Sequence, residues 1–125
     1  MTLELPTVSG GVMSAEGQAV DGEVQVRFAG TADVEAKADL EVFVKRLHTE
    51  VVRLGAAKVI VDLRELEFMN SSCFKIFVAW LAQVRDLDPD NQYRIHLRSN
   101  PNLLWQRRSL AALSCFAVDL VAIET

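Results

Sequence analysis

A buried strand that leads directly into a helix is the feature that most constrains the fold of this sequence. Residues 59–61, Val-Ile-Val, form a continuous apolar run, which is typical of a strand covered on both faces. Beyond Phe68 the spacing of apolar residues changes from that of a strand to that of a helix. Asn70, Ser71 and Ser72 fall at this change, where side-chain oxygens can accept hydrogen bonds from the first N–H groups of a helix. The segment therefore predicts a strand, a short loop and a helix whose N-terminus carries hydroxyl groups.

Short strands and longer helices alternate along the rest of the chain. Turn residues and apolar periodicity predict strands at 11–16 and 23–29 around the turn at 20–22, a helix from 30–31 to 54, a strand at 58–63, a helix at 72–85, a strand at 93–98, a helix starting at 100–101 and a strand at 118–123. This order favours an α/β domain with at least partly parallel strand pairing. The length of 125 residues predicts one domain over 1–125, with residues 1–10 as a loose leader.

Composition and charge exclude several classes of function. The net charge of −4 and pI near 5.1 argue against electrostatic binding of nucleic acid or of an anionic membrane. No apolar stretch is long enough for a membrane span, so direct insertion is not expected. The N-terminal residues show no signal peptide, and Cys73 and Cys115 are too few for a disulfide framework. A cytoplasmic protein with reduced thiols is therefore expected.

The helix after the serines is more apolar than one contact surface requires. Between Cys73 and Leu81 only Lys75 is polar, and the apolar side chains cover an arc of roughly 200° on a helical projection. One interpretation is a central helix covered by the sheet and by neighbouring helices. The other is that a flank with Phe74, Lys75 and Val78 faces a partner protein.

The segment from Val59 to Phe74 resembles the central motif of STAS domains, the family of sulfate transporter and anti-sigma factor antagonist domains. Here Val-Ile-Val-Asp-Leu is followed by Leu-Glu-Phe-Met-Asn-Ser-Ser-Cys-Phe, and the family's usual form has Asp-Ser-Ser-Gly-Leu after the strand. Asn70 stands where the family has aspartate, and Cys73 stands where it has glycine. The element order matches over nearly the whole chain. The resemblance implies a STAS-like α/β fold: a central mixed sheet of four to five strands with helices mainly on one face.

The resemblance also implies a phosphorylation-controlled protein-interaction module of bacterial transcription regulation. An anti-sigma factor that is also a serine kinase would bind the unphosphorylated protein, phosphorylation would release it, and a phosphatase would restore binding. The phosphoacceptor would be Ser72, with Ser71 as the second candidate, and Asn70, Cys73, Phe74, Lys75 and Val78 would form the partner surface. The protein would be a monomer or weak dimer.

Two other functions fit the same sequence features. One is a small STAS subunit of an ABC-type lipid transporter complex that binds the ATPase through the same helix. The other is a scaffold domain that packs through its exposed apolar flank without a switch. Partner binding that is independent of Ser72 would favour the first, and concentration-dependent oligomers would favour the second.

Catalytic and metal chemistry have little support in the sequence. A helix N-terminus lowers the pKa of a thiol, so Cys73 could be a nucleophile, but only His48 and His96 could act as its base and neither is near it in sequence. The cysteines and histidines lack the spacing of a metal site, and no glycine-rich phosphate loop is present, so no cofactor is expected and a non-enzymatic protein is predicted. Asp62 is interpreted as a carboxylate that organises the loop after its strand.

Basic residues near the C-terminal helix leave two interpretations open. Arg94 and Arg98 lie on a predicted strand, and Arg107 and Arg108 follow Trp105 on the predicted helix. They form either a solvated basic face or a contact for an acidic partner. Trp105 lies opposite the apolar stripe of its helix and is predicted to be exposed.

Overall fold

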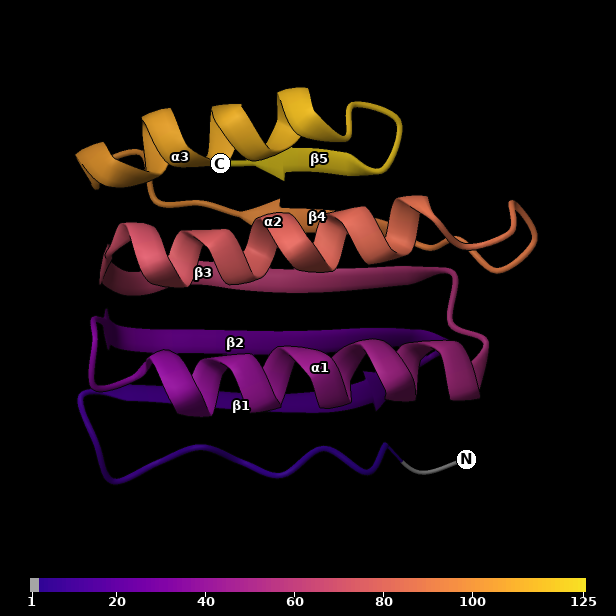
Figure 1. The fold of residues 1–125 in the computed structure, drawn as a ribbon, viewed down its shortest axis with the longest axis horizontal. Helices are drawn as coiled ribbons and strands as arrows, with labels where there is room; N and C mark the ends of the chain where they lie inside the picture. Colours follow the sequence, from indigo (N-terminus) through magenta and orange to yellow (C-terminus); the bar gives the residue numbers. More distant parts are fainter. Residues whose placement is uncertain (1–2) are drawn as a thin grey trace.

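Five strands form one mixed sheet in the order β1-β2-β3-β4-β5 in the computed structural model, which describes residues 3–125 (Figure 1). β1 and β2 are antiparallel, and β2 to β5 are parallel to one another. The elements are β1 (Met13–Val20), β2 (Glu23–Ala32), α1 (Lys37–Leu54), β3 (Lys58–Met69), α2 (Ser71–Arg85), β4 (Arg94–Arg98), α3 (Leu104–Phe116) and β5 (Val121–Glu124). The predicted α/β class and mixed sheet are confirmed.

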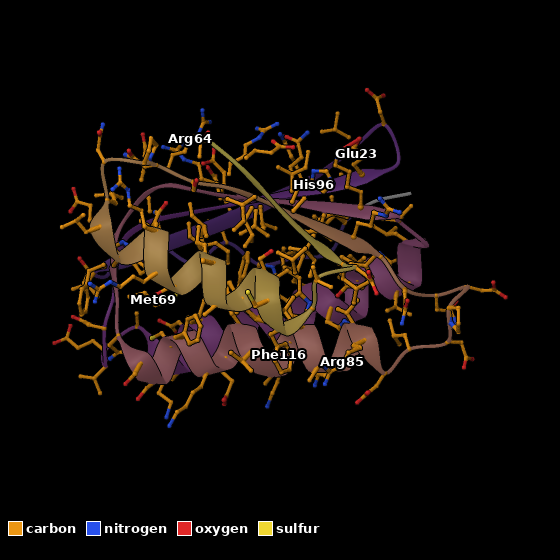
Figure 2. The ribbon with its side chains drawn as sticks, turned by 90° about the horizontal axis from the view of Figure 1, so that it is seen from above. Glu23, Arg64, Met69, Arg85, His96 and Phe116 are labelled. Atoms are coloured by element: carbon orange, nitrogen blue, oxygen red, sulfur yellow. The ribbon has the colours of Figure 1, made fainter. Side chains whose placement is uncertain are left out.

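The three helices lie on the same side of the sheet (Figure 2). Strand side chains alternate accordingly: Val24, Val26 and Phe28 of β2 are buried toward the helices. On the other side, Glu23, Arg64 and His96 project away from the helices, and we call this surface the open face (Figure 2). α2 lies between α1 and α3, so neighbouring helices cover most of its wide apolar arc (Figure 1).

Several element boundaries differ from the sequence-based expectation. The helix predicted from Gly30 begins at Lys37, because β2 continues to Ala32, and β3 continues to Met69 where an end near Leu63 was predicted. The two extensions pair with each other, from Ala29 opposite Glu65 to Ala32 opposite Met69. Each strand supplies the hydrogen-bond partners that the other needs, and local periodicity does not report such pairing.

The start of the last helix also differs. Asn100 and Pro101 belong to a turn in which the Asn100 side chain accepts from the backbone N–H of Asn102 at 2.9 Å, and α3 begins only at Leu104. The last strand is shorter than predicted because residues 117–120 form a turn before Val121.

Residues 3–8 are not loose, and residues 1 and 2 lie outside the described part of the chain. The backbone N–H of Glu4 donates to the Glu50 carboxylate at 2.7 Å, and Arg46 donates to the Glu4 carbonyl at 2.9 Å. Val8 forms a two-way backbone bridge with Ala15 of β1. Arg53 and the Glu4 N–H lower the pKa of the buried Glu50 carboxyl to about 2. The segment therefore covers the outer edge of β1 (Figure 1).

A polar network lies between α1, α2 and the start of β4. The Trp80 indole N–H donates to the Tyr93 hydroxyl at 2.7 Å, and the hydroxyl lies 2.6 Å from Nδ1 of His48. Because the indole can only donate, the Tyr93 proton is available for His48 Nδ1, which then accepts as a neutral imidazole. Burial lowers the pKa of His48, which also favours the neutral ring.

No helix within residues 3–125 is long and apolar enough to span a lipid bilayer.

We expect Gly30→Ala to destabilise the protein more than Gly22→Ala does. Both glycines have positive φ angles, 92° and 81°, so both substitutions carry the cost of about 1–2 kcal/mol for a left-handed residue. Only at Gly30 would a new Cβ meet backbone, at 2.3 Å from the Val12 carbonyl oxygen, whereas at Gly22 the space is open. Urea unfolding of both variants measures the difference. Equal losses of unfolding free energy in the two variants would show that the backbone at Val12 moves away from a Cβ at residue 30 without cost.

We also expect the unfolding free energy to fall as the pH drops from about 7.5 toward 5.5. The pKa of His48 is lower in the folded state than in the unfolded state, so the unfolded state takes up more protons in this range. Protonated Nδ1 could no longer accept the Tyr93 proton. His48→Gln should remove this part of the pH dependence and His96→Gln should retain it, as measured by thermal unfolding across the range. Unchanged pH dependence in the His48 variant would contradict the assignment.

Candidate protein-interaction site at the start of helix α2

Asn70 caps α2 and joins it to the end of β3. Its side-chain oxygen accepts from the backbone N–H of Cys73 at 2.9 Å, and its own N–H donates to the Ala32 carbonyl at 2.9 Å. With φ −81° and ψ 169° it has the extended backbone typical of an N-cap residue. An amide thus performs the capping that an aspartate would perform, but it adds no charge.

Ser71 and Ser72 occupy the first turn of α2. Ser71 is exposed and Ser72 is half-buried. Within the described part of the chain neither hydroxyl forms a hydrogen bond, so neither is engaged in capping. The first turn contains no acidic side chain that would interact favourably with the positive end of the helix dipole.

Cys73 does not contribute to the molecular surface, which corrects its predicted place on the partner face. Its side chain is 0% exposed, and the thiol lies 3.5 Å from the Asp33 carbonyl oxygen in the loop after β2. Burial raises the pKa of the Cys73 thiol, which disfavours the thiolate that a nucleophile needs. Cys73 is therefore a core residue that packs the start of α2 against this loop.

The predicted flank of α2 is narrower than its sequence suggested. Lys75 is exposed, while Phe74 and Val78 are half-buried and pack against the core. Ala79 is exposed and Ala82 is half-buried, and the other apolar residues of the helix are buried. The surface available on α2 near the serines is thus Lys75 with the outer edges of Phe74 and Val78.

Exposed apolar side chains from other segments lie at the same end of the sheet as this helix start. Val34 is 75% exposed, Leu104 76%, Phe68 47% and Val12 42%. Backbone hydrogen bonds join the segments of three of them: Val12 O accepts from Thr31 N, and Asn70 N donates to Ala32 O. We call Val12, Val34, Phe68 and Leu104 the apolar rim. Sequence reasoning missed it because these residues occupy the ends of elements and not a periodic stripe.

The N-terminus of α3 contacts β3 beside the rim. Trp105, predicted to be exposed, is half-buried, and its indole N–H donates to the Leu66 carbonyl at 3.0 Å. Gln106 is buried and donates to the carbonyls of Leu63 and Leu66. Sequence reasoning did not identify Gln106; a polar residue on the buried side of an amphipathic helix was the available signal.

Asp62 lies on the open face and not beside the serines. It accepts from the backbone N–H of Arg64 at 3.1 Å and pairs with the Arg64 guanidinium at 2.7 Å. Arg64 lowers the pKa of the Asp62 carboxyl. The carboxylate thus accepts a backbone N–H within a continuing strand, whereas the sequence placed Asp62 before a loop.

The four arginines do not form one basic surface. Arg94 and Arg98 belong to β4 on the open face, where Arg98 lies 3.7 Å from Glu124, whereas Arg107 and Arg108 are exposed on α3, on the helix side of the sheet. Within residues 3–125 no cluster of three or more His, Cys, Asp or Glu side chains could hold a metal ion.

The fold is shared with solved anti-sigma factor antagonists. An anti-sigma factor antagonist from Mycobacterium paratuberculosis superposes with a TM-score of 0.60 and 19% identity, over 82% of this chain and 80% of that one. The anti-sigma factor antagonist SpoIIAA in its unphosphorylated form gives 0.61 and 15%, over 89% and 88%. The Bacillus cell fate determinant SpoIIAA in its phosphorylated form gives 0.54 and 16%, over 89% and 91%. No family model and no curated sequence matches this chain. The chain therefore has the STAS-like fold of these antagonists, as its sequence motif implied.

We expect Asn70→Ala to lower the unfolding free energy by about 0.5–2 kcal/mol, because it removes the cap of α2. Asn70→Asp should be neutral or stabilising, since a carboxylate keeps the cap and gains about 0.3–1 kcal/mol from the helix dipole. Urea denaturation of both variants tests this. A loss in the aspartate variant equal to that in the alanine variant would contradict the capping role.

Proposed function

We propose that this chain is a non-enzymatic, phosphorylation-controlled protein-interaction module of the anti-sigma factor antagonist type. In this proposal Ser72 is the phosphoacceptor and Ser71 the second candidate. The partner is an anti-sigma factor that is also a serine kinase, and a phosphatase reverses the modification. The observation that carries the proposal is a pair of unengaged serine hydroxyls at a helix N-terminus, at the end of the sheet where four exposed apolar side chains also lie.

The fold adds independent support. One of the structural neighbours, SpoIIAA, is an anti-sigma factor antagonist whose structure has been solved in unphosphorylated and phosphorylated forms. The serine pair of this chain follows a central parallel strand at the carboxyl ends of β2 and β3, an edge at which α/β proteins commonly place their binding sites.

The surroundings of the serines explain why phosphate would release a partner. A partner seated on the apolar rim would bury Val34, Phe68 and Leu104 together with the first turn of α2. A phosphate brings nearly two negative charges to this surface. The helix dipole stabilises such a charge by only about 0.3–1 kcal/mol, whereas enclosing it in an apolar contact costs several kcal/mol. The unphosphorylated form is therefore the binding form.

Exposure favours modification of both serines to different degrees. Ser71 is the more accessible residue, and Ser72 is half-buried. Trypsin cleaves after Arg64 and Lys75, so one peptide spanning residues 65–75 contains both serines, and fragmentation spectra distinguish them.

We expect Ser72→Asp to weaken partner binding about tenfold or more, and Ser72→Ala to retain it. The protein is isolated from its native cells, and its phosphopeptides and co-purifying proteins are identified by mass spectrometry. The affinities of both variants for the co-purifying kinase are then measured by calorimetry. Gln18→Asp is the matched control, because Gln18 is exposed near the other end of β1 and the substitution adds the same charge away from the rim.

Equal affinities of the Ser72→Asp and Ser72→Ala variants, with no phosphate on peptide 65–75, would overturn the switch. Recovery of transporter subunits that bind both variants equally would instead identify a constitutive subunit of an ATPase complex.

A further inference from the structure

β3 extends well beyond the strand next to it. It pairs with β4 only from Lys58 opposite Arg94 to Asp62 opposite Arg98, yet it continues to Met69. On the β4 side, the backbone carbonyls after Asp62 therefore have no strand to bond with. Buried backbone groups need hydrogen-bond partners, so other donors must take the place of a strand here.

Two side chains of α3 supply those donors. Gln106 Nε2 lies 2.6 Å from the Leu63 carbonyl oxygen and 3.2 Å from that of Leu66, and the Trp105 indole N–H donates to Leu66 at 3.0 Å. Gln106 is only 1% exposed, and its own oxygen accepts from the Asn100 N–H at 2.7 Å. The NH₂ group and the oxygen of the buried amide are thus both bonded to backbone groups.

The β2 side of the same segment is irregular. The register with β2 shifts between Arg27 and Ala29 and again between Gly30 and Thr31. Such bulges interrupt the ladder and bend the strand. Between Asp62 and Met69, β3 thus has an interrupted ladder on one edge. On the other edge its carbonyls are bonded by the two α3 side chains and by Asn100 Nδ2, in the turn after β4, which donates to the Arg64 carbonyl at 3.2 Å.

We infer that Gln106, assisted by Trp105, is a positioning residue that holds this half of β3 and thereby fixes the N-cap and the serine pair at the start of α2. Leu66 is bonded by both side chains and lies four residues before Asn70, which is tied to Ala32 by its N–H. Displacement of Leu66 would move the cap and both hydroxyls. The inference rests on the proposed function for the role of the two serines. The effect of Gln106 on the position of the serines can be tested without a partner.

The position of Leu104 links this contact to the apolar rim. Leu104 is 76% exposed and directly precedes Trp105. A partner that covers Leu104 would therefore contact the turn of α3 whose side chains hold Leu66.

Amide hydrogen exchange and NMR spectra of the full chain test the inference without a partner. In Gln106→Met, exchange at residues 67–73 should accelerate about tenfold or more beyond the change in the slowest core amides, and the Ser71 and Ser72 resonances should shift. Gln92→Met is the matched control, because Gln92 Nε2 also donates to two carbonyls, those of Arg85 and Leu87, at the far end of α2. Its effects should remain near residues 85–92.

Equal acceleration in all regions, or the same pattern in both variants, would overturn the inference and leave Gln106 an ordinary core residue. If Gln106→Met does not fold, Trp105→Phe, which removes only the indole donor, gives the same readout in milder form.

Gln106→Glu tests the donor role by protonation. The ionised carboxylate cannot donate to the carbonyls of Leu63 and Leu66, so the serine resonances should return toward their original positions when the acid is protonated. Failure of the proposed function would appear separately, as equal partner affinity of the Ser72 variants with a normal Gln106 result.

Discussion

The hydrogen-bond requirement of β3 organises the end of the molecule that carries the serine pair. A central strand has two edges, and each buried backbone group on them needs a partner. β2 follows β3 to Met69, whereas β4 ends opposite Asp62, so α3 must approach closely enough for Gln106 and Trp105 to reach the remaining carbonyls. The same approach places the start of α3 beside the start of α2. The start of α3, with Leu104 of the apolar rim, lies near the serine pair because β3 is longer than β4.

The two departures from the family motif are accommodated locally. Asn70 keeps the capping geometry without the charge of an aspartate, and Cys73 fills the space against the Asp33 backbone where a glycine would leave it open. Neither substitution engages or covers the serine hydroxyls. A phosphate added here would consequently meet a neutral cap residue.

The open face shows how register creates a property that no segment possesses alone. Glu16, Arg27, Asp62, Arg98 and Glu124 stand opposite one another across the five strands, so charge alternates in sign over the whole sheet. Opposite charges on neighbouring strands contribute roughly 0.2–1 kcal/mol per pair. This row places Arg98 between Asp62 and Glu124, so that this arginine of β4 does not stand alone as a basic site.

The sequence by itself determined the order of strands and helices, the α/β class, the two-residue turn at Asp21–Gly22 and the strand-to-helix transition at Asn70. These features depend on residue periodicity, on turn chemistry and on capping, which act over a few neighbouring residues. Only the tertiary structure decided that β2 and β3 extend past their predicted ends, that Cys73 is buried, that Trp105 and Gln106 hold β3, and that four apolar side chains from separate elements form one rim. Each of these depends on hydrogen bonds or packing between residues far apart in the chain, and a one-dimensional pattern of polar and apolar residues does not contain the register that creates them.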